Sequence, residues 1–206
     1  MSQPDNYTEL EVKLYVPDLN TIRERLEAAN ATLVFARVHE QNLRYDNSKG
    51  DLAGNGYVLR LRQDSIARIT YKEPKDPAAE AKGIHARYEA EVTVSDFEAT
   101  DTILKKLGFT VFMTYEKYRT TYHFNGCEVV LDEMPYGNFV EIEADNEAAI
   151  DQIIAQLELD DAPRIVHSYA ELFENIKAAL NLTFRDLTFD NFDGIDIPQS
   201  VLNKSS

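Results

Sequence analysis

The segment TELEVKLYV, residues Thr8–Val16, alternates between charged and apolar side chains and decides the fold. Because successive side chains of a β-strand point to opposite sides, residues two apart share a face. One face of this strand is therefore apolar, and the other carries two carboxylates and an ammonium group, those of Glu9, Glu11 and Lys13. Taken alone, the pattern is that of a half-buried strand with a solvated polar face.

The same charged alternation recurs in later segments, which argues against simple solvation. Same-face pairs of one sign occur in YVLRLRQ, RYEAEVTV, YEKYRTTYHF and GNFVEIEAD: Arg60 and Arg62, Glu89 and Glu91, Lys117 and Arg119, Glu141 and Glu143. Lys72 and Asp132 are single charges on two further predicted strands. Such faces must either be exposed or line the interior of a sheet that curls on itself.

The order of predicted elements is strand, helix, several strands, helix, several strands and helices, which is typical of an α+β protein with a mostly antiparallel sheet. One predicted helix begins at Asp18 or Asn20, and a second is capped by Ser95 or Asp96 and closed by Gly108. If helices cover the apolar face of the sheet, the charged face can line the lumen of a closed barrel. We expect one principal domain, residues 1–182, and an acidic extension, residues 183–206, that is either docked or disordered.

Composition excludes several classes of protein. The net charge of -15 argues against a nucleic-acid surface, since affinity for a polyphosphate backbone comes from clustered Lys and Arg. The single cysteine, Cys127, excludes an internal disulfide and a Cys-based zinc cluster, and we expect it to be a packing residue. The sequence has no apolar run long enough to span a bilayer and no signal-peptide pattern at its start, so we expect a cytoplasmic protein without membrane contact.

A lumen that carries both signs suits a polyanion bound together with hard cations. Carboxylates supply oxygen ligands for Mg²⁺ or Mn²⁺, while Arg and Lys bind phosphate oxygens. The scarcity of His and Cys on these faces favours Mg²⁺ or Mn²⁺ over zinc. The charged faces therefore predict a site for a metal-bound triphosphate, and the alternative is a set of interstrand ion pairs with no ligand.

Together these motifs resemble the CYTH superfamily, the triphosphate tunnel metalloenzymes. The run Glu9-Leu10-Glu11-Val12-Lys13 matches its Glu-x-Glu-x-Lys signature. The motifs LRLR, TYK, YEAEV, YEKYR, VVLDE and GNFVEIE follow in the expected order, and HSYAEL is similar to an element of class IV adenylyl cyclase-like members. The resemblance spans roughly residues 7–175 and implies an eight-stranded antiparallel β tunnel with helices packed on its outer face.

The resemblance also implies roles for the charged residues. Four carboxylates become ligands of Mg²⁺ or Mn²⁺: Glu9, Glu11, Glu141 and Glu143. Six basic residues become ligands of the triphosphate: Lys13, Arg60, Arg62, Lys72, Lys117 and Arg119. A second acidic group holds another metal ion or orients the attacking oxygen: Glu89, Glu91 and Asp132. Arg68 and Arg87 lie on the right faces but have no firm counterpart in the family.

The family implied by these motifs contains more than one activity. We expect a metal-dependent phosphohydrolase whose small-molecule substrate is inorganic, thiamine or nucleoside triphosphate. The alternatives are a class IV adenylyl cyclase, which converts ATP to cyclic AMP and pyrophosphate, and a noncatalytic polyphosphate-binding module. The segment Pro74–Ala86, with Lys75 and Lys82, is a candidate lid, and the resemblance leaves a homodimer open.

Overall fold

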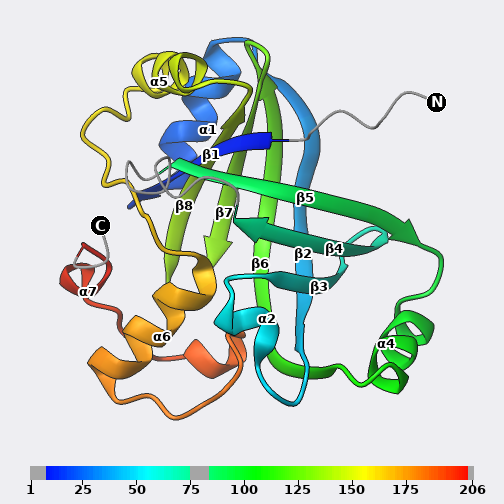
Figure 1. The fold of residues 1–206 in the computed structure, drawn as a ribbon. Helices are drawn as coiled ribbons and strands as arrows, with labels where there is room; N and C mark the ends of the chain where they lie inside the picture. The colour runs from blue at the N-terminus through cyan, green and yellow to red at the C-terminus, as the bar shows by residue number, and fades with distance from the viewer. Residues whose placement is uncertain (1–7, 75–83, 204–206) are drawn as a thin grey trace, which may run out of the picture.

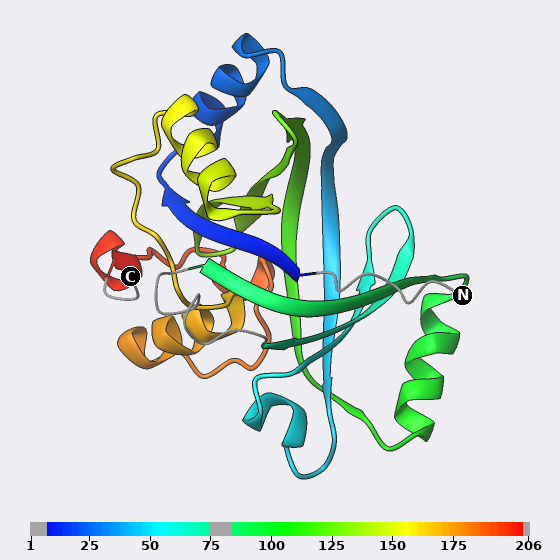
Figure 2. The same cartoon turned by 45° about the horizontal axis from the view of Figure 1, so that its top comes forward.

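The barrel predicted from the alternating segments is present. The structure, a computed structural model, describes residues 8–74 and 84–203. In this part of the chain, eight antiparallel strands form a closed barrel in the order β1-β5-β4-β3-β2-β6-β7-β8 (Figures 1 and 2). The strands are β1 (Thr8–Val16), β2 (Thr32–Asp46), β3 (Val58–Gln63), β4 (Ala67–Pro74), β5 (Ile84–Val94), β6 (Thr110–Phe124), β7 (Cys127–Met134) and β8 (Gly137–Ala144). The candidate lid, with Lys75 and Lys82, lies largely outside the described residues.

Short helices connect or follow the strands. They are α1 (Leu19–Ala28), α2 (Asp51–Gly54), α4 (Phe97–Lys106), α5 (Glu147–Gln156), α6 (Tyr169–Leu180) and α7 (Gln199–Asn203), with a 3-10 turn, η1, at Asp190–Phe192. As predicted, the Asp18 and Asp96 side chains accept hydrogen bonds from backbone N–H groups in the first turns of α1 and α4, and Gly108 follows α4 with a φ of +94°. No described helix is both long and apolar enough to cross a bilayer.

The outer face of the barrel is the apolar face of the strands. Val12 of β1 and Ile142 of β8, both 0% exposed, pack against Leu26 of α1 and Ile150 of α5. Cys127 is buried in the same cluster, and burial raises the pKa of its thiol, so its predicted packing role is confirmed. Figure 1 shows α1 and α5 together over one part of this face and α4 at the other side of the barrel.

The last helices and the C-terminal segment cover the other face instead. On strands β6, β7 and β8, Tyr115, Met134 and Phe139 share the face of the charged side chains by alternation, and they pack against α6 and the segment that follows it. Leu187 of that segment is 0% exposed. The part of the acidic extension that the structure describes, residues 183–203, is therefore docked, and with α6 it covers one end of the inner face.

The β6–β7 hairpin sets the register that the charged face depends on. Its turn is Asn125-Gly126, with φ values of +51° and +84°, the left-handed conformations that a two-residue hairpin of type I′ requires. From this turn the pairing runs to Arg119 opposite Asp132. Because directly opposed residues point to the same side of the sheet, the turn brings two predicted site residues into contact.

Candidate active site inside the barrel

The predicted basic and acidic residues meet on the inner face of the barrel. Between β1 and β8, Lys13 is opposite Glu141, and Glu11 is opposite Glu143. The Lys13 ammonium lies 3.3 Å from Glu141 Oε1 and 3.8 Å from Glu11 Oε1, and Lys13 is only 3% exposed. Glu9 is opposite Arg87 of β5 in the backbone register, but their side chains are not among those described.

Arg119 and Asp132 form the centre of the inner face. The Arg119 guanidinium donates to both oxygens of Asp132, at 2.8 and 2.6 Å, and to Glu141 Oε2 at 2.5 Å. Lys117 donates to Asp132 Oδ2 at 2.9 Å, and Asp132 is 0% exposed. Burial opposes the charge of Arg119, but Asp132 and Glu141 raise its pKa well above the usual range. This group is therefore fully ionised and held by charge-assisted hydrogen bonds.

Glu40 of β2 belongs to the same network, although it was not among the site residues predicted from the sequence. Its carboxylate lies 3.6 Å from Lys117 Nζ, 3.5 Å from Arg62 Nη1 and 4.0 Å from Arg119 Nε. Burial would raise the pKa of Glu40, but the three cations, Lys117 foremost, lower it below its usual value. The signal was present in the alternation of Glu40, Asn42 and Arg44 with Gln41, Leu43 and Tyr45.

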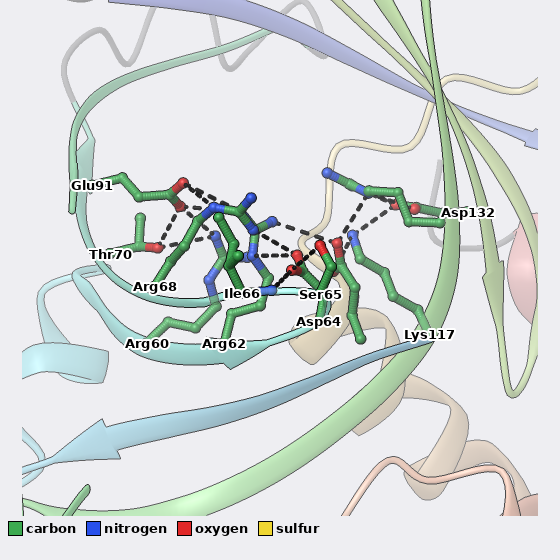
Figure 3. A network of polar contacts seen from close by, with 12 residues as sticks. Arg60, Arg62, Asp64, Ser65, Ile66, Arg68, Thr70, Glu91, Lys117 and Asp132 are labelled. Atoms are coloured by element: carbon green, nitrogen blue, oxygen red, sulfur yellow. Dashed lines mark hydrogen bonds and ion pairs between the residues drawn. The ribbon is translucent and has the colours of Figure 1, made fainter. Parts of the chain in front are cut away.

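A second network joins β3, β4 and β5, and Figure 3 shows its side chains gathered inside the curve of the sheet. Arg60 donates to Thr70 Oγ1 at 3.2 Å, and Thr70 in turn donates to Glu91 Oε2 at 2.8 Å. Arg62 donates to both Glu91 oxygens at 3.3 Å. Arg68, which had no firm family counterpart, also lies 3.5 Å from Glu91, so it joins this network.

Lys72 and Glu89 form a further ion pair at the side of the second network. Their side chains are about one fifth exposed, 22% and 19%, so they are far less enclosed than Lys117 and Asp132. Every predicted site side chain that the structure describes therefore lies on the inner face. Each is paired with a group of opposite charge, except that Glu143 lies across from Glu11. Their roles as metal ligand, substrate ligand or catalytic group stay predictions.

Tyr169, at the start of α6, closes the charged region on the side of the docked helix. Its hydroxyl donates to Asp132 Oδ2 at 2.9 Å, and the Lys13 ammonium lies 4.3 Å from the centre of its ring. Such a cation–π contact stabilises a buried ammonium group. The Ser168 side chain caps α6 in a capping box and so fixes where this ring enters the barrel.

Replacing Tyr169 by Phe tests whether this hydroxyl supports the site. The ring and its contact with Lys13 stay, while Asp132 loses one of its donors. We expect the free energy of unfolding to fall by about 1–2 kcal/mol, since a hydrogen bond to a charged group is lost. Chemical denaturation measures this, and an unchanged midpoint would show that the hydroxyl bond contributes nothing.

The carboxylates on β1 and β8 are of the kind that binds a hard cation, but those that the structure describes are not arranged around a common point. Among residues 8–74 and 84–203, no three His, Cys, Asp or Glu side chains already converge as a cation site, and the Lys13 ammonium stands between Glu11 and Glu141. Burial, followed by the charge of Glu11, raises the pKa of Glu143 to about 8. A divalent ion with oxygen ligands would relieve the repulsion between crowded carboxylates of this kind.

The comparisons with known proteins agree with this geometry. The family model of the CYTH domain matches residues 8–169. The fold is similar to that of PH1012 from Pyrococcus horikoshii, with 25% identity, a TM-score of 0.65, and coverage of 79% of this chain and 98% of that one. It is also similar to a proposed adenylate cyclase from Vibrio parahaemolyticus, with 20% identity, a TM-score of 0.69, and coverage of 81% and 98%.

A third similar structure is a proposed adenylyl cyclase from Hippeastrum with a dominant triphosphatase activity. It shares 18% identity at a TM-score of 0.58, over 81% of this chain and 95% of that one. No curated protein sequence matches the chain. The family model covers most of the chain and contains all of the charged strands, so the chain belongs to the CYTH family.

Proposed function

We propose that this protein is a metal-dependent phosphohydrolase that acts on a triphosphate bound inside the barrel. The observation that carries the proposal is the buried inner face, where Lys13, Lys117 and Arg119 stand beside Glu11, Asp132 and Glu141. Basic groups of this kind bind phosphate oxygens, while the carboxylates suit hard cations. A binding module would need the first set and would gain nothing from the second, which argues against a noncatalytic role.

In this proposal the basic residues bind the substrate and the acidic residues of β1 and β8 bind the metal ion. The cations Lys13, Arg60, Arg62, Lys72, Lys117 and Arg119 bind the nonbridging oxygens and neutralise the charge that develops on them. Glu9, Glu11, Glu141 and Glu143 hold Mg²⁺ or Mn²⁺, which, when bound, supplies Lewis-acid stabilisation of the transferred phosphoryl group.

Two members of the second acidic group act on the attacking water, and the third has a different role. Glu89 and Glu91 are partly accessible, with side chains 19% and 29% exposed, and orient that water in line with the terminal phosphorus. Asp132 is enclosed by Lys117, Arg119 and the Tyr169 hydroxyl, so it acts by holding the two cations, Lys117 and Arg119, in place.

Class IV adenylyl cyclase activity is the second candidate, because HSYAEL is similar to the corresponding element of such members. A cyclase must also bind adenine, and aromatic side chains commonly do this by stacking. The aromatic residues Tyr136 and Phe139 at one end of the inner face instead pack on each other, and Phe139 also packs on Tyr169, the first residue of α6. This packing supports the hydrolase over the cyclase.

Product analysis separates the two activities. Purified protein is incubated with Mg²⁺ or Mn²⁺ and, in parallel, inorganic triphosphate, thiamine triphosphate and ATP. We expect orthophosphate, and the substrate with the highest kcat/KM identifies the ligand class. Cyclic AMP and pyrophosphate from ATP would overturn the hydrolase assignment, and no turnover of any of them would leave the protein a binder.

Because the pKa of Glu143 is raised, we expect the stability of the metal-free protein to depend on pH. Its pKa of about 8 in the folded state lies above its ordinary value of 4.5, so the folded protein binds the extra proton between these limits. The contribution of Glu143 to the free energy of unfolding is therefore fully present below about pH 4.5. It is lost as the pH rises to about 8, which lowers the free energy of unfolding by on the order of a few kcal/mol. Denaturation in EDTA across this range measures it, and Glu143→Gln should remove this part of the slope. An identical pH profile in that variant would contradict the assignment.

A further inference from the structure

The side-chain amide of Asn42, on β2, is buried without any hydrogen bond. Asn42 is 0% exposed, and within the described residues neither its Oδ1 nor its Nδ2 has a partner. Burying an amide without compensating hydrogen bonds is unfavourable, and native proteins satisfy nearly all such groups. An unsatisfied amide in the middle of a charged interior therefore marks a position that requires a further polar partner.

Tyr115 of β6, directly opposite Asn42 on one side, already accepts a hydrogen bond from Arg60, and the other candidates for that partner are arginines of β3, on the other side. Asn42 is directly opposite Arg62 of β3, and the next pair along the inner face is Arg44 opposite Arg60. The Nε atoms of Arg60 and Arg62 are buried and, among the described residues, they too have no hydrogen-bond partner. An amide whose oxygen and nitrogen are both unsatisfied thus shares one face of two paired strands with two guanidinium Nε–H groups that make no hydrogen bond. A carboxylate oxygen, Asp64 Oδ2, lies 3.7 Å from the Arg62 Nε.

Arg62 is held much less firmly than Arg119. Its hydrogen bonds to Glu40 and Glu91 are 3.5 and 3.3 Å long, whereas Arg119 makes contacts of 2.5 to 2.8 Å with Glu141 and Asp132. The longer distances lie outside the usual range for charge-assisted bonds. Its third carboxylate neighbour, Asp64, is farther still, with Oδ2 3.7 Å from Nε. Burial, and then the neighbouring Arg60, lower the pKa of Arg62. This guanidinium is therefore suited to turn toward an added anion.

We propose that Asn42 is a positioning residue for Arg62 in the polyphosphate-bound protein. When the anion draws the guanidinium away from Glu40, Asp64 and Glu91, the Arg62 Nε–H donates to Asn42 Oδ1, which fixes the plane of the guanidinium. The remaining N–H groups of Arg62 then face the phosphoryl oxygens. This inference rests on the proposed function and adds to it the residue that orients one of its phosphate ligands.

A double-mutant cycle tests the proposal by binding rather than turnover. Titration calorimetry with a nonhydrolysable imido analogue of tripolyphosphate, in Mg²⁺, compares wild type, Asn42→Leu, Arg62→Met and the double variant. We expect Asn42→Leu to raise the Kd about tenfold in the wild-type background and hardly at all beside Arg62→Met, since the two residues act as one unit. Its Tm should not fall, because an unsatisfied buried amide has been replaced by an apolar group of similar size.

The matched control is Thr120→Val, which removes a buried hydroxyl, 4% exposed, from the outer face of β6 and should leave the Kd unchanged. If Asn42→Leu does not fold, Asn42→Ser replaces it in the same cycle. An unchanged Kd in the Asn42 variant, or an equal loss in both backgrounds, overturns the positioning role alone. If wild type itself does not bind the analogue, the proposed function falls together with the inference.

Discussion

Replacing Arg119 by Met should lower the free energy of unfolding by about 3–5 kcal/mol and abolish turnover. The guanidinium neutralises Asp132, which is 0% exposed, and also contacts Glu141 at 2.5 Å. Its removal leaves two buried carboxylates with only the ammonium groups of Lys117 and Lys13, and an incompletely paired buried charge costs several kcal/mol. For a chain of this size the melting temperature should fall by roughly 10 °C. Chemical denaturation measures the free energy of unfolding, and thermal denaturation measures the melting temperature.

Arg37→Met is the control for this prediction, because Arg37 makes the same kind of bidentate contact elsewhere on the barrel. Its guanidinium donates to both oxygens of Glu133 at 2.7 and 2.9 Å, but its side chain is 47% exposed. A solvent-exposed pair contributes about 0–1 kcal/mol. If both variants lose the same stability, burial is not what makes the Arg119 network important.

The alternation of charge along the strands was enough to predict the barrel and most of its inner face. A period of two residues is a local property, so Glu11, Lys13, Glu141 and Glu143 could be assigned to one face without knowing the strand order. The helix starts at Asp18 and Asp96 were predictable for the same reason, because a capping side chain acts within its own turn.

Residues on β2 escaped prediction because their pattern is mixed. The strand runs from Thr32 to Asp46, and its pairing with β6 is regular only from Val38 to Arg44, so the two-residue period holds over a short stretch around Glu40 and Asn42. Its inner positions carry an acid, an amide and a base in turn, so no same-sign pair marked Glu40 and Asn42.

Tyr169 escaped prediction for a different reason. Its contact with Asp132 joins residues 37 positions apart and exists only because α6 docks on the inner face. No local pattern of the sequence encodes that docking, since the amphipathic pattern of a helix indicates that it is covered but not by which surface.

Replacing Glu11 by Gln should reduce metal-dependent turnover at least about a hundredfold while the barrel stays folded. Even residues that only support metal ligands typically cost ten- to a hundredfold when they are changed, so loss of a ligand should exceed that range. The substitution keeps the shape of the side chain and removes one of two opposed carboxylates, because Glu11 is paired with Glu143 across β1 and β8. The pKa of Glu143 should therefore move back toward its usual value, and metal-free protein should be no less stable than wild type.

The stabilisation by Mg²⁺ separates loss of metal binding from loss of a later step. A ligand that binds only the folded state raises the melting temperature, and tighter binding raises it more, so wild type should be stabilised by millimolar Mg²⁺ and Glu11→Gln should not be. Glu133→Gln, which removes a strand carboxylate that pairs with Arg37 on the outer face, should retain both the Mg²⁺ effect and the turnover. Normal Mg²⁺ stabilisation and normal turnover in the Glu11 variant would show that the Glu-x-Glu pair on β1 does not hold the metal. The resemblance to metal-dependent members of the family would then not extend to this site.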